Sequence, residues 1–134
     1  MSTVGSIAIS GLSAAALRMQ VSANNVANVY SSGPLPDAAA GANFPAAFVP
    51  QGVDQAARTD GSVSTTVKPV SPATVPAYDP TAPFANASGL VAMPNGDLGN
   101  EAVQQIMASV SYAANAAVLK TDAQMTSTLL NIMA

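Results

Sequence analysis

Reactive side chains are scarce in this sequence of 134 residues. Histidine and cysteine are absent, and the seven carboxylates are scattered. Asp54 and Asp60 are the nearest approach to an acid pair or a cation site, but no further carboxylate lies close to them in sequence. Calcium binds about six to eight oxygen ligands, so we interpret both as surface residues. Without a phosphate-binding glycine loop or a nucleophile elbow, the sequence favours neither an enzyme nor a cofactor or metal site.

The other polar residues of interest are three asparagines, Asn24, Asn25 and Asn28. One interpretation places them on a solvated flank near the end of a helix, where Asn is tolerated. The alternative is that Asn24 and Asn28, one turn apart, bond to a neighbouring helix and fix its register, as a buried Asn does in coiled coils. Similarly, Tyr112 either packs in a core or, with Asn115 on the same face, contacts another subunit.

The C-terminal part of the chain must position most of these groups, and it is typical of one long amphipathic helix. Its polar flank carries Gln104, Ser111, Asn115, Asp122 and Thr126, which are almost uncharged as a group. A helix of this length spans about 45 Å, so its apolar stripe needs a partner other than a compact local core. The stripe recurs at steps of three, four or seven residues and comprises Val103, Met107, Val110, Ala114, Val118, Met125, Leu129 and Ile132.

A second helix is predicted at the N-terminus, with the alternating spacing of a coiled-coil seam. Small residues dominate both helices, so a single pair buries little area and is weakly held. We therefore expect bundling with further copies, and fraying when the chain is alone. The N-terminal seam consists of Ile9, Leu12, Ala16, Met19, Ala23, Val26 and Tyr30.

Between the helices the sequence predicts a small β insertion followed by an extended connector. The stretches 44–57 and 62–67 read as strands joined by an Asp60-Gly61 turn, and Pro45 and Pro50 make the first strand irregular. Five prolines between 69 and 83 then indicate an extended strap. Asp97 or Asn100 is expected to cap the C-terminal helix.

The predicted fold is therefore mainly α. Long N- and C-terminal helices form a coiled-coil-like pair or bundle, with a small irregular β-hairpin insertion and a Pro-rich extended connector. We divide the chain into an N-terminal helix at 1–33, a loop, β insertion and strap at 34–96, and a C-terminal helix at 97–134.

The composition indicates which classes of partner the chain can bind. Charged residues make up only 8%, the net charge is −3 and the pI is near 4.3, so the chain has no basic footprint for nucleic acid and is prone to associate with proteins. The N-terminus lacks the basic start of a secretory signal, and no apolar run reaches the ~18 residues of a membrane span. We expect no direct membrane insertion and no cleaved signal peptide.

Two blocks of sequence resemble a known family. Ser22 to Asn28 is similar to the Asn-rich signature near the N-terminus of bacterial flagellar axial proteins. A more specific block comprises Tyr78-Asp79-Pro80, Pro83, Gly89 to Asn95, and a helix bearing Ser109, Tyr112, Asn115 and Val118; it resembles the rod proteins of the flagellar basal body. Together the blocks cover about two thirds of the chain. Gly33 to Pro36 and Leu90 depart from the family pattern, so the middle is not mapped by the resemblance.

The resemblance implies a structural subunit of the rod, the shaft that crosses the periplasm and passes torque from motor to hook. Its implied partners are other copies of itself, other flagellar rod proteins and the flagellar type III export apparatus. A diverged axial paralogue and a non-flagellar coiled-coil adaptor remain alternatives. The expected subunit-interface residues are Ile9, Leu12, Ala16, Met19, Ala23, Asn24, Asn25, Val26, Asn28, Val103, Met107, Val110, Tyr112, Asn115, Val118, Met125, Leu129 and Ile132.

Overall fold

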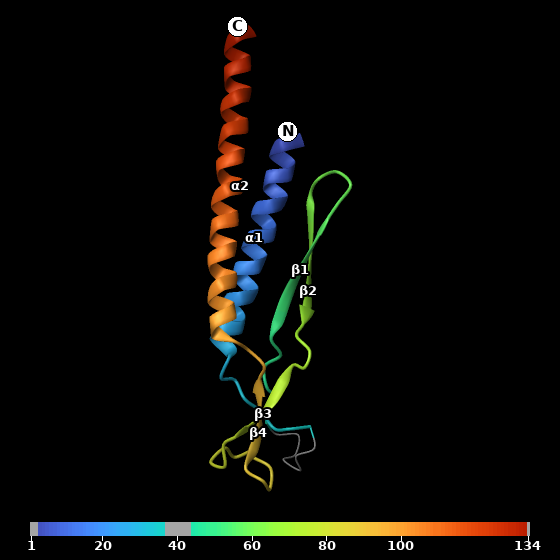
Figure 1. Ribbon diagram of the computed structural model, residues 1–134, viewed down its shortest axis with the longest axis vertical. Helices are drawn as coiled ribbons and strands as arrows, with labels where there is room; N and C mark the ends of the chain where they lie inside the picture. The colour runs from blue at the N-terminus through green and yellow to red at the C-terminus, as the bar shows by residue number, and fades with distance from the viewer. Residues whose placement is uncertain (1–2, 37–43, 134) are drawn as a thin grey trace.

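The computed structural model describes residues 3–36 and 44–133; part of the predicted loop, at 37–43, lies outside them. The chain is elongated, with two long antiparallel helices, one hairpin beside the first helix and a second hairpin below (Figure 1). This confirms the predicted mainly helical fold with a β insertion. The elements are α1 (Thr3–Asn28), β1 (Gln51–Ala57), β2 (Val63–Pro69), β3 (Thr74–Tyr78), β4 (Leu90–Pro94) and α2 (Leu98–Met133).

Asp97 is the N-cap of α2; the sequence predicted either Asp97 or Asn100 at this position. Its Oδ1 accepts a hydrogen bond of 2.9 Å from the backbone N–H of Gly99, and its carbonyl accepts the N–H of Glu101 at 2.9 Å. These bonds satisfy donors that the first turn of a helix leaves unpaired. The carboxylates of Asp97 and Glu101 also lie at the positive end of the helix dipole.

The first hairpin confirms the turn predicted at Asp60-Gly61. Strands β1 and β2 pair antiparallel, and Gly61 adopts a φ of 81°, which a residue with a side chain rarely adopts. The Asp60 carboxylate accepts bonds from the N–H of Ser62 at 2.9 Å and from its hydroxyl at 2.5 Å. The hydroxyl and N–H of Ser62 together hold the pKa of Asp60 below its ordinary value.

The Pro-rich connector is corrected by the structure, because part of it forms a second hairpin. Strand β3 pairs antiparallel with β4, and Pro76 lies opposite Ala92 in that register. A proline fits here because an edge strand of a small sheet does not need every N–H in the ladder. On the other side of β4, Gly33 and Ala92 exchange backbone hydrogen bonds of 3.0 and 2.9 Å. The insertion therefore holds the end of α1 and the approach to α2 together.

The helix α1 lies between α2 and the first hairpin (Figure 1). The face of α2 that packs inward combines most of the polar flank with Ala108, Ala116 and Leu119, and among its described residues only Ala108 is fully buried, at 1% exposure. Gly11 is needed for the close approach of the helices, because a β-carbon there would lie 2.5 Å from Asn115 Oδ1. The buried or half-buried residues of α2 are Glu101, Gln104, Gln105, Ala108, Ser111, Asn115, Ala116, Leu119 and Asp122.

A buried polar cluster joins α1, α2 and β1. Asn25 is only 4% exposed, and its Nδ2 donates to the carbonyl of Gln51 and to Glu101 Oε1, both at 2.7 Å. Its Oδ1 accepts the N–H of Gln51 at 3.0 Å. The Ser22 hydroxyl adds a bond of 3.1 Å to the backbone carbonyl of Glu101. One asparagine thus fixes the relative positions of three elements.

The first prediction concerns this cluster. Asn25→Ala removes three hydrogen bonds and leaves Glu101 and the Gln51 backbone without those partners, so we expect the free energy of unfolding to fall by about 2–3 kcal/mol. The matched control is Asn24→Ala, one residue away, which removes only the exposed bond from Asn28 Nδ2 to Asn24 Oδ1 within α1, with an expected change of less than about 0.5 kcal/mol. Urea unfolding of the full chain followed by circular dichroism measures both. Equal effects would contradict the assigned role.

The second prediction concerns the contact of Gly11 with Asn115. Gly11→Ala gains helix propensity of about 1 kcal/mol, but it forces Asn115 off its position and its 2.8 Å bond to the Ser111 carbonyl, at an overpacking cost of about 1–3 kcal/mol. We expect a net loss of stability for the single variant. Adding Asn115→Ala should restore it, because the smaller side chain clears the β-carbon. A double-mutant cycle showing no coupling would refute this packing.

Candidate assembly interface

The apolar stripe of α2 faces away from α1. Its seven large side chains are 45% to 76% exposed, and we name them the outer stripe. Because the polar flank fills the contact with α1, nothing in the described part of the chain covers this stripe. The residues of the outer stripe are Val103, Met107, Val110, Val118, Met125, Leu129 and Ile132.

The predicted seam of α1 lies at the border of the helix pair. Leu12 and Met19 are half-buried. The remaining five members are exposed, namely Ile9, Ala16, Ala23, Val26 and Tyr30. This seam therefore contributes to the contact between the two helices and also leaves apolar surface for a neighbour.

The predicted asparagines have different surroundings. Asn28 Nδ2 donates to the carbonyl and to Oδ1 of Asn24 at 3.0 and 2.9 Å, both within α1. A register role toward another helix stays a prediction for these two. Asn25 lies instead in the buried cluster, which the sequence reasoning did not identify. No pattern in the sequence distinguished it from its neighbours, since its partner Gln51 is distant along the chain.

Tyr112 and Asn115 share a helix but meet different surroundings. Asn115 is half-buried against Gly11 inside the chain. Tyr112 is 49% exposed and lines a groove between α1 and α2. Of the pair, Tyr112 alone therefore offers substantial surface to another molecule.

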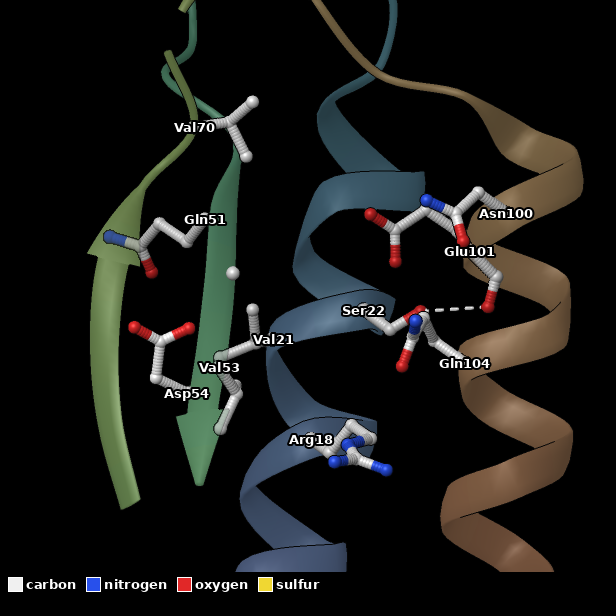
Figure 2. A pocket seen from close by; sticks show the side chains of 11 residues that line it. Arg18, Val21, Ser22, Gln51, Val53, Asp54, Val70, Asn100, Glu101 and Gln104 are labelled. Atoms are coloured by element: carbon white, nitrogen blue, oxygen red, sulfur yellow. Dashed lines mark hydrogen bonds between the residues drawn. The ribbon is translucent and has the colours of Figure 1, made fainter. Parts of the chain in front are cut away.

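A polar cavity of about 250 Å³ lies between α1, β1 and the start of α2 (Figure 2). Arg18 and Ser22 line it from α1, Val53 from β1, and Glu101 and Gln104 from α2, whereas the Asp54 side chain points away from α1, toward β2. The Asp54 carboxylate itself lies 2.6 Å from Lys68 Nζ in an exposed ion pair. The cavity presents charges of both signs, and the Ser22 hydroxyl that lines it donates to the backbone carbonyl of Glu101.

An apolar groove of about 530 Å³ lies on another face of the helix pair. Its wall on α1 includes Ala15, Ala16, Met19 and Ala23, and Tyr112 stands on the α2 side. None of its lining residues is charged. The small side chains keep it open, because they do not fill the space between the helices.

The end of α2 continues past the first described turn of α1 (Figure 1). Every side chain from Ala123 to Ile132 is exposed, and no charged residue follows Asp122. We name Met125 to Ile132 the α2 tip. It presents Met125, Leu129 and Ile132, together with Leu130 at 64% exposure, without an apolar partner in the described part of the chain.

Two further properties of the described residues concern metal binding and membranes. Within 3–36 and 44–133, no cluster of three His, Cys, Asp or Glu side chains is placed to hold a metal ion. By length and composition alone, α1 meets the criteria for a membrane-spanning helix. Core helices and N-terminal signal sequences also meet those criteria, and α1 here packs between α2 and a hairpin.

Comparison with known proteins adds independent findings. Residues 6–34 match the family model described as flagella basal body rod protein. The chain is 38% identical over 120 residues to the flagellar basal-body rod protein FlgC of Yersinia enterocolitica, covering 86% of this chain and 84% of that protein.

Two other relatives carry the same name. FlgC of Salmonella typhimurium is 39% identical over 119 residues, with 86% of this chain and 84% of that protein covered. FlgC of Borreliella burgdorferi is 33% identical over 144 aligned residues, with 95% and 93% covered. These matches do not favour a non-flagellar adaptor. Since the similarity extends over most of both chains, the protein belongs to the FlgC family of flagellar basal-body rod proteins.

Proposed function

We propose that the protein, a structural subunit of the flagellar basal-body rod, assembles through its terminal helices into the shaft that transmits torque from motor to hook. The observation that carries the proposal is the outer stripe of α2, a row of seven exposed apolar side chains on a chain from a rod-protein family. Water contact with such a row is unfavourable, so neighbouring subunits are its natural cover.

The size of the stripe indicates how many neighbours are needed. Full burial of one such side chain contributes about 1.5–3 kcal/mol, so covering the exposed half contributes about 1 kcal/mol each, or roughly 7 kcal/mol in total. Association costs an estimated 4–15 kcal/mol in lost translational and rotational freedom. One helix packing on one stripe is therefore marginal, and we propose coiled-coil-like bundling with several neighbours at once.

The interface expected from the sequence is retained as a proposal, with one refinement. The outer stripe, the exposed part of the α1 seam and Tyr112 face neighbours, whereas Asn25 and Asn115 support the subunit from inside. In this scheme 1–33 and 97–134 form the axial core of the shaft, and 34–96 lies beside it. Partners are other copies, other rod proteins and, during delivery, the flagellar type III export apparatus. The chain needs neither a cleaved signal nor membrane insertion.

Ordering on assembly follows from the same distribution of contacts. The lower parts of the helices are held by the Asn25 cluster, while the α2 tip has no apolar partner within the described chain. The tip buries apolar area only against neighbouring subunits. The entropy cost of ordering it is therefore offset only on assembly. Such a chain also stays easy to unfold for export.

The third prediction tests the assembly role. Val110→Glu places a charge in the centre of the outer stripe, and burying an unpaired charge is strongly unfavourable. We expect the variant to keep its helical circular dichroism but to fall at least about tenfold in recovery from isolated basal bodies, with loss of swimming. Lys120→Glu is the control, because that exposed position of α2 already carries a charge. Normal incorporation of Val110→Glu would sink the proposal.

The fourth prediction tests ordering on assembly. In the isolated full chain, amides between Met125 and Ile132 should exchange with deuterium on the order of a hundredfold faster than those between Glu101 and Ala108. In isolated basal bodies the difference should shrink, because neighbours then cover the tip. Hydrogen exchange followed by mass spectrometry measures both states. Equal protection at the two ends of α2 in the isolated chain would count against this view.

A further inference from the structure

We propose that the α2 tip of one copy inserts into the apolar groove between α1 and α2 of the next copy. This inference rests on the proposed assembly function and names the two surfaces that meet. The groove is bounded by Ala15, Ala16, Met19 and Ala23 of α1 and by Ala108 and Tyr112 of α2. The occupant is Met125 to Ile132 of a second copy.

The shape of the tip requires a site with two walls. Successive residues of an α-helix are rotated by about 100°, so Leu129 and Leu130 project in different directions around the axis. They are 63% and 64% exposed, and Ile132 is 76% exposed. A flat helix face covers one side of such a tip and leaves the other side exposed to water. A groove between two helices covers both sides.

The lengths of the two surfaces agree. At ~1.5 Å per residue, the groove wall from Ala15 to Ala23 spans about 12 Å, and the tip from Met125 to Ile132 spans about 11 Å. The end of α2 extends beyond the described start of α1, so the tip is free to reach another copy (Figure 1). The groove lies in the part of the helix pair nearer the hairpin β3–β4.

Charge distinguishes the groove from the polar cavity. The tip has no charged residue, and neither has the groove lining. The polar cavity, in contrast, is lined by Arg18 and Glu101. Inserting an apolar tip there would take the Arg18 guanidinium out of water without providing a partner for it, which is costly. Of these two sites, the apolar groove matches the tip.

The geometry also has a consequence for growth. Tip and groove are different surfaces of one chain, so the contact is head-to-tail and leaves a free tip and a free groove at the two ends. The centres of the two surfaces are about 18 residues apart along α2, so parallel copies would be offset by about 27 Å along the helix. Such a contact extends along an axis rather than closing into a two-fold dimer.

Disulfide trapping tests the contact directly, since the chain has no cysteine of its own. The full chain carrying Ala16→Cys and Leu129→Cys is produced in cells that lack the natural gene, and basal bodies are isolated under mild oxidation. We expect covalent dimers and longer ladders of this chain. The control chain carries Leu129→Cys with Gln55→Cys on the exposed side of β1 and should give none.

The outcomes separate this inference from the proposed function. If the Ala16→Cys, Leu129→Cys chain is incorporated and supports swimming without cross-linking to itself, the tip-to-groove contact is wrong while the rod function stands. A cross-link of Leu129→Cys to a different rod protein overturns the inference in the same way. If the chain is absent from basal bodies even without substitutions, the proposed function itself fails.

A second measurement covers variants that do not incorporate. In sedimentation of the purified full chain, Leu129→Ser with Leu130→Ser should weaken self-association at least about tenfold, equivalent to about 1.4 kcal/mol. Leu98→Ser removes the same kind of side chain at the other end of α2 and should leave association unchanged. Equal association of all three chains, or a natural chain that stays monomeric at every concentration, overturns the contact, since every copy carries both surfaces.

Discussion

The contact between α1 and α2 is made mostly by small and polar side chains, and the rest of the molecule depends on this. Gly11 lets Asn115 lie against the backbone of α1, and Ala108 is the one fully buried residue on the inner face of α2. A close but thin contact leaves the large apolar side chains for the outside. The usual arrangement of an amphipathic helix, with its apolar face inward, is thereby reversed. A chain arranged in this way has its greatest hydrophobic stabilisation still to gain when it leaves the pair for an assembly.

Because the apolar contact within the pair is thin, hydrogen bonds must set its geometry. Asn25 performs this role, since it bonds to β1 and α2 from a position on α1. Hydrogen bonds are directional, whereas hydrophobic contact is not, so one satisfied amide fixes register more strictly than several alanines do. The cluster lies near the start of α2, and the helix pair therefore becomes less constrained toward the α2 tip.

Local chemistry could be predicted from the sequence, and long-range pairing could not. The turn at Asp60-Gly61 and the cap at Asp97 depend on residues within a few positions of each other, and both were correctly predicted. The second hairpin was missed because five prolines dominate the local signal, while the pairing of β3 with β4 depends on partners across a long loop. Proline argues against a central strand, but it does not argue against an edge strand.

The helical stripe was located correctly, but its direction could not be read from periodicity. Periodicity states which residues share a face, and it does not say whether that face meets the chain's own partner or another molecule. The contacts on the opposite face of α2 show which way the stripe points. The polar flank of α2 has Asn115 opposite a glycine and Glu101 opposite Asn25, so these two polar groups have complementary sites on α1. The outer stripe has no such complement within the described chain. In a helix pair with specific partners on its polar flank, an apolar stripe that lacks them therefore supports the proposed assembly, and the proposed contact of the α2 tip with the groove would extend that assembly along the helix axis.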